Sequence, residues 1–211
     1  MMFENLIHYL LDGDHKQAVI EANQFLAAGI SPEDIVTSAI EETMSYLDEK
    51  CTVEHFNLLE IMLVGRAVME VMKVLYSQKQ QPPATKGTIV VAALEGDVHD
   101  IGKNIIKMIL TSRGYNVIDC GKDCSTNSLI SIVEKNHPLA VGIAGLIPTV
   151  IPQVQSLRNK LHEVGMSRIK VIAGGGALKQ LSATYLNVDT VVQNVFDLYR
   201  YLEDLGSNKD E

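Results

Sequence analysis

Apolar residues recur at helical spacing through the first 76 residues of the chain. The spacing predicts helices over 3–11, from Asp14 to about Ala28, from Ser31 onward and over about 53–76. Asp14 and Ser31 are residue types that cap helix N-termini. Four amphipathic helices with short connections predict a small antiparallel bundle.

The last two helices of this bundle carry a stripe of apolar residues that we expect to face its interior. These residues recur mostly three or four positions apart, as one face of a helix requires. We expect the methionines at 62, 69 and 72 to be core residues rather than cofactor contacts, because they share the helical spacing. The stripe comprises Ile35, Ala39, Ile40, Met44, Leu47, Leu58, Ile61, Met62, Gly65, Val68, Met69 and Met72.

The pattern changes after a polar, proline-bearing stretch at 78–87. Short apolar runs predict strands at 88–94, 116–119, 139–144, 169–173 and 190–192, and helices over 102–112, 125–135, about 151–164, 178–186 and 194–205. Strands that alternate with helices in this way predict a parallel sheet with helices on both faces. The expected fold class is therefore α/β, with an N-terminal four-helix bundle followed by a flavodoxin- or Rossmann-like five-stranded sheet. We place a helical domain at 1–80, a linker at 81–87 and the sheet domain at 88–211.

Composition and charge exclude several classes of function. The 211 residues are 46% hydrophobic with a net charge of −8, and no Lys/Arg-rich run suggests a nucleic-acid partner. No run of about 18 apolar residues predicts a membrane span, and the N-terminus does not resemble a signal peptide. The three cysteines form neither a disulfide framework nor a zinc pattern, so we expect a cytoplasmic protein.

Three loops follow the carboxyl ends of predicted strands, where ligands of such sheets bind. They are EGDVHDIG at 95–102, GLIPTV at 145–150 and GGGAL at 174–178. Taken singly, each has a plain structural explanation: a loop histidine is usually solvated, and glycines often only ease a turn. None of the three loops assigns a function by itself.

The three loops together indicate a more specific chemistry. Asp97 lies two residues before His99, so both side chains can point the same way in an extended loop. A carboxylate bound to one ring nitrogen fixes the tautomer and makes the other nitrogen a better metal donor. One histidine and one carboxylate are too few ligands for a zinc ion, but they suit a metal held by a macrocycle that needs one axial ligand. Gly102 and the GGG turn would let a bulky planar ligand approach the backbone.

These residues also resemble a known family. DVHDIG at 97–102 matches the D-x-H-x-x-G motif of cobalamin-binding proteins, the group that includes the cobalamin module of methionine synthase. VGIAGL at 141–146 resembles the S-x-L loop of that family, and GGA at 175–177 resembles its glycine pair. LLDGDHKQAVIEANQFLAAGISPEDIV at 10–36 and SYLDEKCTVEHFNLLEIML at 45–63 resemble its helical cap. The resemblance covers about residues 5–203.

The resemblance implies roles for individual residues. His99 would be the lower axial ligand to cobalt, in place of the benzimidazole of the cofactor, and Asp97 would hold His99 and couple its basicity to proton uptake. Gly102 would accommodate the nucleotide tail, and Asp100 and Lys103 could be contacts or simply solvated. His99 is the expected metal ligand, and no residue is assigned a catalytic role. The expected cofactor contacts are Asp97, Val98, His99, Asp100, Ile101, Gly102, Ala144, Leu146, Thr149, Gly174, Gly175, Gly176, Leu58 and Cys51.

Three positions depart from the pattern of the family. Ala144 stands where the family usually has a serine against the displaced benzimidazole. A gapless match places Val150, next to Thr149, where a serine or threonine usually extends the Asp–His relay. Cys51 stands where a phenylalanine usually covers the upper face of the corrin, while Leu58 matches the leucine of the family. These changes put the proton-linked tuning of His99 in doubt, but not its role as the ligand.

The resemblance implies a corrinoid protein of a methyltransferase system. Such a protein carries a methyl group on cobalamin, is not catalytic alone, and has a substrate:corrinoid methyltransferase, a corrinoid:acceptor methyltransferase and a reductive activator as partners. Its cap shields the upper face of the corrin, which makes the linker a candidate hinge.

Other functions remain open from the sequence alone. The main alternative is a cobalamin-binding sensor or storage module, since TVEHF at 52–56 faintly resembles a Glu-His pair of some sensor caps. A mutase subunit would generally lack the helical cap, and a flavin- or nucleotide-binding protein would leave DVHDIG unexplained.

Overall fold

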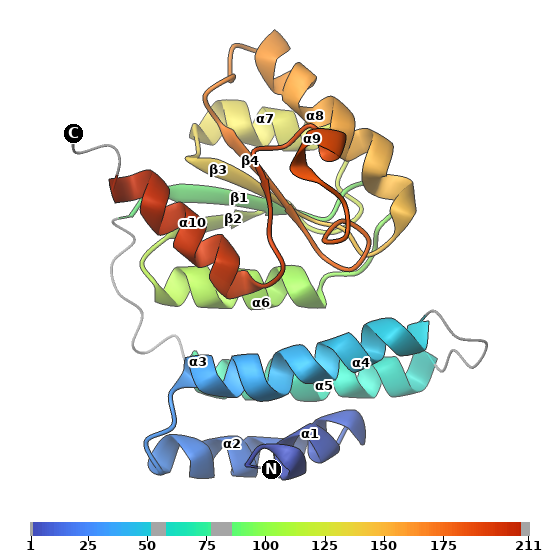
Figure 1. Cartoon of the computed structure of the whole chain (residues 1–211), viewed down its shortest axis with the longest axis vertical. Helices are drawn as coiled ribbons and strands as arrows, with labels where there is room; N and C mark the ends of the chain where they lie inside the picture. The colour runs from blue at the N-terminus through green and yellow to red at the C-terminus, as the bar shows by residue number, and fades with distance from the viewer. Residues whose placement is uncertain (1, 52–57, 77–85, 208–211) are drawn as a thin grey trace. The chain divides into compact units, whose positions relative to one another are not determined.

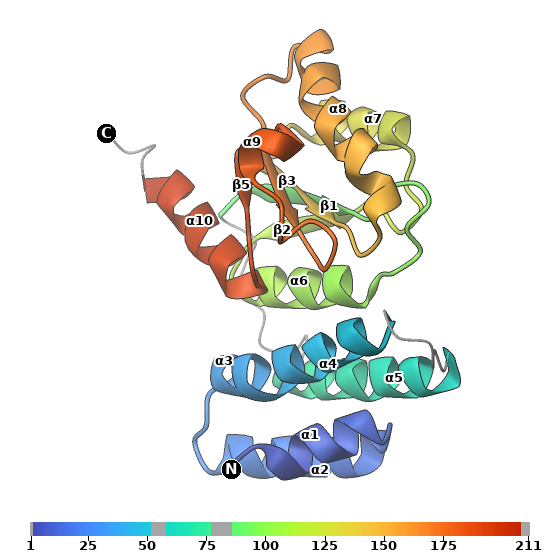
Figure 2. The same cartoon turned by 45° about the vertical axis from the view of Figure 1, so that its right-hand side comes forward.

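The chain folds as two compact units, Met1–Gln80 and Gln81–Glu211, which we call the helical unit and the sheet unit. The computed structural model describes residues 2–51, 58–76 and 86–207, except for the side chains of 47–51, 58, 61, 112 and 207. Figure 1 labels most helices and strands of each unit, and Figure 2 also labels β5. The side chains of Leu47, Cys51, Leu58 and Ile61 and the segment 52–56 therefore lie outside the description.

The helical unit contains the predicted helices, with one irregular turn. Its elements are α1 (Glu4–Leu11), α2 (His15–Ala27), α3 (Pro32–Ile35), a π-helical turn (Val36–Ile40), α4 (Glu41–Cys51) and α5 (Leu58–Leu75). Both predicted caps are confirmed, because Asp14 Oδ1 accepts from the Gln17 amide at 3.1 Å and Ser31 Oγ accepts from the Asp34 amide at 3.1 Å. The π turn lies where one continuous α-helix was expected from Ser31 onward.

The apolar stripe of the helical unit is confirmed at most described positions, and Met62 is the exception. Ile35, Val68 and Met72 are fully buried, whereas the side chain of Met62 is 63% exposed. Val64 lies on the buried face of α5, and a residue two positions away lies about 200° around a helix. The expectation that Met62 belongs to the core is therefore wrong, because Met62 is on the opposite face of α5.

The sheet unit is a five-stranded, all-parallel sheet in the order β2-β1-β3-β4-β5. This is the flavodoxin-like order, so the predicted fold class is confirmed. The strands are β1 (Thr88–Ala92), β2 (Asn116–Asp119), β3 (Ala140–Ala144), β4 (Lys170–Gly174) and β5 (Thr190–Val191). The helices are α6 (Ile101–Ser112), α7 (Thr126–Asn136), α8 (Ile151–Glu163), α9 (Ala183–Leu186) and α10 (Val195–Ser207), with a 3₁₀ turn at Pro148–Val150.

Helices cover both faces of the sheet, as Figures 1 and 2 show. On one face, Val90 of β1 and Val141 of β3 pack in a cluster with residues of α7 and α8. On the other face, Ile89 of β1 packs in a cluster with residues of α6 and α10. Successive residues of β1 thus point to opposite faces and are buried on both, which explains the continuous apolar run.

The helix expected over 178–186 is mostly wrong. Only Ala183–Leu186 is helical, beginning where Ser182 Oγ accepts from the Tyr185 amide at 3.1 Å. The preceding residues form hydrogen-bonded turns, and Leu178 points into the core and is fully buried. The helix is a single turn, because it begins after the Ser182 cap and ends at Asn187, which has φ +56°. None of the described helices is both long and apolar enough to span a membrane.

Candidate functional site

The candidate site lies at the carboxyl end of β1, where the order in which strands are added to the sheet reverses. The chain adds β2 on one side of β1 and then places β3 on its other side, so the loops after β1 and β3 leave neighbouring strands at their carboxyl ends. After β1 the backbone turns back, with the Asp97 amide donating to the Leu94 carbonyl at 2.9 Å. Gly96 occupies the turn at φ +91°, a conformation that favours glycine.

The turn buries Asp97 and leaves His99 accessible. Asp97 Oδ1 lies 2.7 Å from His99 Nδ1 and accepts from the His99 amide at 3.0 Å, and Oδ2 accepts from the Leu146 amide at 2.7 Å. Because a carboxylate can only accept, the hydrogen bond assigns the ring proton to Nδ1 and leaves the Nε2 lone pair free. Asp97 is fully buried, while the side chain of His99 is 46% exposed. The structure thus brings together Asp97, His99 and Leu146.

This arrangement offers a metal one donor atom. Among the described residues, no group of three or more His, Cys, Asp and Glu side chains could hold a metal ion. A metal bound through Nε2 must therefore bring its other ligands with it, as the cobalt of a corrin does. The donor set of the described residues fits such a cofactor.

The glycines of the site have two different explanations. A Cβ added at Gly102 would meet no heavy atom within 4 Å, so that surface of α6 is open to a ligand. A Cβ at Gly175, which has φ +97°, would lie 2.6 Å from the Gly145 carbonyl oxygen. The Gly145 amide also donates to the Gly174 carbonyl at 2.9 Å. Gly175 is thus required by the close approach of the loops after β3 and β4.

The other expected cofactor residues lie at the same end of the sheet. Val98 is exposed and follows the buried Asp97, and Ala144 is half-buried at the end of β3. Thr149 is exposed, whereas Val150 beside it is fully buried. The remaining positions are Asp100, Ile101 and Gly176, which are half-buried.

Lys103 is not solvated, contrary to one of the two expectations for it. Its side chain is 2% exposed, and Nζ lies 2.5 Å from Asp119 Oδ1 at the end of β2. Burial raises the pKa of Asp119, but hydrogen bonds from Lys103 and from the Gly121 amide outweigh it, so the pKa lies below its usual range. Sequence reasoning missed Asp119, because its partner is 16 residues away along the chain.

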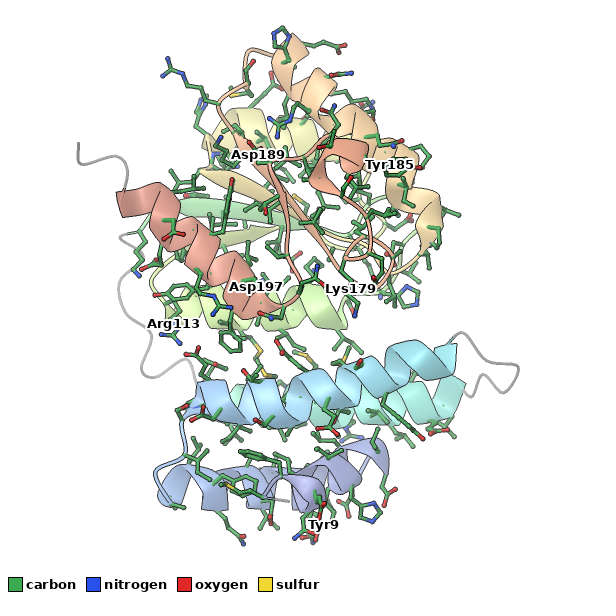
Figure 3. All side chains as sticks on the ribbon, in the orientation of Figure 1. Tyr9, Arg113, Lys179, Tyr185, Asp189 and Asp197 are labelled. Atoms are coloured by element: carbon green, nitrogen blue, oxygen red, sulfur yellow. The ribbon has the colours of Figure 1, made fainter. Side chains whose placement is uncertain are left out.

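A second charged cluster lies at the opposite end of the sheet. Asp189, labelled in Figure 3, precedes β5 and accepts from Lys170 Nζ at 3.1 Å and from the Val171 amide at 2.8 Å. It also pairs with Arg158 of α8. These contacts join α8 to the amino ends of β4 and β5, so they stabilise the fold and do not belong to the site.

Comparisons with known proteins agree with this geometry. A family model described as B12 binding domain matches residues 87–196, and a second model of the same description matches residues 2–76. The methanol–corrinoid protein of Methanosarcina barkeri is 30% identical over 171 residues, which cover 81% of this chain and 66% of that protein.

Two solved structures from Methanosarcina barkeri resemble the chain. The monomethylamine corrinoid protein has a TM-score of 0.83 at 22% identity, covers 96% of this chain and 97% of its own, and shows the fold. A chain of the methanol:cobalamin methyltransferase complex has a TM-score of 0.56 at 25% identity and covers 98% of this chain and 80% of its own. Because the first family model matches slightly more than half of the chain, the protein belongs to the B12-binding family, and cobalamin is its cofactor.

Proposed function

We propose that this protein is a corrinoid methyl carrier that binds cobalamin through His99, with the benzimidazole of the cofactor displaced, and shuttles a methyl group between partner methyltransferases. The observation that carries the proposal is the free Nε2 of His99, whose other ring nitrogen is held by the buried Asp97. When bound, cobalamin supplies a cobalt centre that accepts and releases a methyl group. The remaining expected cofactor contacts are part of the same proposal. They are Val98, Asp100, Ile101, Gly102, Ala144, Leu146, Thr149, Gly174, Gly175, Gly176, Leu58 and Cys51.

The residues of the chain itself would orient and shield rather than react. Asp97 keeps the ring proton on Nδ1, so the lone pair of Nε2 is left to bind a metal. The Leu146 amide holds the second oxygen of Asp97, which fixes the carboxylate against the loop after β3. The open surface at Gly102 would leave room for the nucleotide tail.

The comparisons support the choice of partners. The similar proteins are a methanol–corrinoid protein and a monomethylamine corrinoid protein, and one similar chain comes from a methanol:cobalamin methyltransferase complex. We therefore propose a substrate:corrinoid methyltransferase and a corrinoid:acceptor methyltransferase as partners, with a reductive activator in addition. A cytoplasmic location belongs to the same proposal, because Cys120 and Cys124 are free thiols.

The domain division is also part of the proposal. We assign residues 1–80 to the helical cap domain, 81–87 to the linker and 88–211 to the cobalamin-binding domain. The two family matches support this division, since one ends at residue 76 and the other begins at residue 87.

The proposal is tested by reconstituting the protein with cobalamin and recording absorption and electron paramagnetic resonance spectra. The wild type should show nitrogen coordination from the protein, and His99→Ala should shift the spectrum to the base-off form and weaken binding about tenfold or more, about 1.4 kcal/mol. His162→Ala, which removes an exposed imidazole on α8, is the matched control and should keep the wild-type spectrum. An identical spectrum in His99→Ala would remove His99 from the ligand role.

A second measurement separates the carrier from a sensor or storage module. The methylcobalamin-loaded protein should lose its methyl group when a corrinoid:acceptor methyltransferase is added together with the acceptor substrate of that enzyme, and should keep it without the enzyme. Retention of the methyl group in the presence of active enzymes from both methanol and methylamine systems would favour the sensor or storage module.

A further inference from the structure

The loop after β2 runs beside the loop that carries His99. The Ala93 amide donates to the Gly121 carbonyl at 3.2 Å, and the Cys124 amide donates to the Ala93 carbonyl at 2.9 Å. Leu94 and Cys124 form a parallel bridge beyond the ends of their strands. The pairing of β1 with β2 therefore continues into both loops and brings residues 120–124 alongside residues 93–97.

Asp123 stands out in this loop because of its backbone conformation. Its φ is +54°, in the left-handed region that aspartate and asparagine tolerate better than most residues. In this conformation the Asp123 amide donates to the Asp97 carbonyl at 2.9 Å. The Asp123 carboxylate accepts from the Gly96 amide at 2.7 Å. One residue thus holds the backbone on both sides of Gly96 and Asp97.

These two contacts act on the residue that orients His99. Fixing the Gly96 amide and the Asp97 carbonyl limits the rotation of the backbone between them, and with it the direction of the Asp97 side chain. That side chain must reach both His99 Nδ1 at 2.7 Å and the Leu146 amide at 2.7 Å. A small rotation of the Asp97 backbone would weaken both contacts, because hydrogen bonds lose strength steeply with misalignment.

We infer that Asp123 is a positioning residue for His99, which acts through the backbone of Gly96 and Asp97 from outside the D-x-H-x-x-G motif. The inference rests on the proposed function, since His99 matters as a ligand only if the protein binds cobalamin in that way. Asp123 itself lies in the loop between β2 and α7 and need not touch the cofactor. Its contribution would be to hold the histidine ready, so that less ordering is needed when the metal binds.

Three substitutions separate the two contacts of Asp123. Asp123→Asn keeps an oxygen acceptor and tolerates the left-handed conformation, so it should preserve both contacts. Asp123→Gly keeps the conformation and the amide donor but loses the carboxylate. Asp123→Ala loses the carboxylate and strains the backbone as well. The matched control is Asp197→Ala on α10, because Asp197 Oδ2 also accepts a loop amide, from Gln193 at 3.2 Å (Figure 3).

The first measurement uses the full-length protein without cofactor. Hydrogen exchange of the Gly96 amide should become about tenfold faster in Asp123→Gly and Asp123→Ala and stay unchanged in Asp123→Asn and in the control. Nitrogen chemical shifts of the His99 ring should report the Nδ1-protonated tautomer in the wild type and in Asp123→Asn. They should move toward a mixture of tautomers in the other two variants.

The second measurement uses the protein loaded with cobalamin. The ratio of His99-bound to base-off cofactor should fall about five- to tenfold in Asp123→Gly, further in Asp123→Ala, and not in Asp123→Asn or the control. A wild-type ratio in Asp123→Gly and Asp123→Ala, despite faster exchange at Gly96, would show that Asp123 only supports the loop and would overturn the inference. If the wild type binds cobalamin without His99, the proposed function fails instead, and the tautomer measurement alone then decides whether Asp123 positions the ring.

Discussion

At the residue scale, the site depends on how buried polar groups are satisfied. Asp97 is fully buried, and both of its oxygens accept N–H groups, two from His99 and one from Leu146. Val150, which stands where the family resemblance implies a hydroxyl that would extend the Asp–His relay, is fully buried. The Leu146 amide instead occupies the second oxygen of Asp97. The carboxylate is therefore compensated by backbone hydrogen bonds, and its orientation does not require the missing hydroxyl.

The two cysteines beside Asp123 should be unreactive in the folded protein. Burial, with a smaller effect from the Cys124 thiol, raises the pKa of Cys120 to about 12, and burial also raises the pKa of Cys124. At about pH 8 the thiolate fraction of Cys120 should then be roughly a thousandfold below that of an ordinary cysteine. We expect both to resist iodoacetamide in the native protein, as measured by peptide mass spectrometry, and to react after denaturation in guanidinium. Equally fast labelling of Cys120 in the native and denatured protein would contradict this.

At the scale of elements, the ion pair of Lys103 and Asp119 joins the first turn of α6 to the end of β2. Lys103→Met should lower the free energy of unfolding by about 2–3 kcal/mol, because it removes the buried cation that contacts this largely buried carboxylate directly and leaves only the more distant Lys107. Urea unfolding measures this loss. Lys107→Met is the matched control, since Lys107 Nζ lies 3.8 Å from Asp119 Oδ2 and is half exposed. Its effect should stay below about 0.5 kcal/mol, and equal losses in the two variants would contradict the assignment.

The same pair predicts a dependence on pH. The pKa of Asp119 is lower in the folded protein than its ordinary value, so the folded protein gains stability from the ionised carboxylate. This contribution is present above about pH 4 and is lost as the pH falls through the pKa of the folded state. The difference in stability between the wild type and Lys103→Met should therefore narrow in acid. A difference that stays constant down to about pH 2 would argue that Lys103 acts through packing alone.

The sequence was sufficient to predict elements whose signals are local. β2 has the predicted limits of 116–119, and β1 begins at the predicted residue 88, because apolar runs of strand length mark buried strands. The helix N-caps at Asp14 and Ser31 were also predictable from the sequence. The failures depend on contacts between distant residues. Leu178 turns toward Gly145 instead of continuing a helix, and Lys103 finds Asp119.

In the candidate site too, contacts between residues close in the sequence were predictable, and contacts between distant residues were not. The Asp97–His99 pair was predictable because the two residues lie two positions apart, and the hydrogen bond between them is in the structure. The partners that complete it, the Leu146 amide and Asp123, come from loops 49 and 26 residues beyond Asp97. A sequence motif records only the residues of one loop, whereas the parallel sheet brings three loops to the same edge.

At the scale of the molecule, the sheet unit contains everything that the candidate site uses among the described residues. Both hydrophobic clusters on the sheet consist of residues of the sheet unit. The residues just before β1 make hydrogen bonds within the sheet unit. The Lys86 amide donates to the Gly114 carbonyl at 3.1 Å, and the Gly87 carbonyl accepts from the Asn116 amide at 2.9 Å. Lys86 Nζ also lies 2.7 Å from Glu203 Oε2, and Tyr115 donates to Glu203 Oε1 at 2.7 Å.

A fragment that begins at residue 81 should therefore fold alone and bind cobalamin with the wild-type spectrum. A fragment that begins at residue 88 loses Lys86 and Gly87, and should be less stable by about 1–2 kcal/mol in urea unfolding followed by circular dichroism. Lys86→Met in the longer fragment separates the effect of the ion pair from that of the backbone contacts, since it removes the partly exposed ion pair and keeps the backbone contacts. This variant should lose less than about 1 kcal/mol of stability. An unfolded longer fragment would show that the sheet unit does not fold alone. Equal stability of the two fragments would show that the start of β1 is not held in this way.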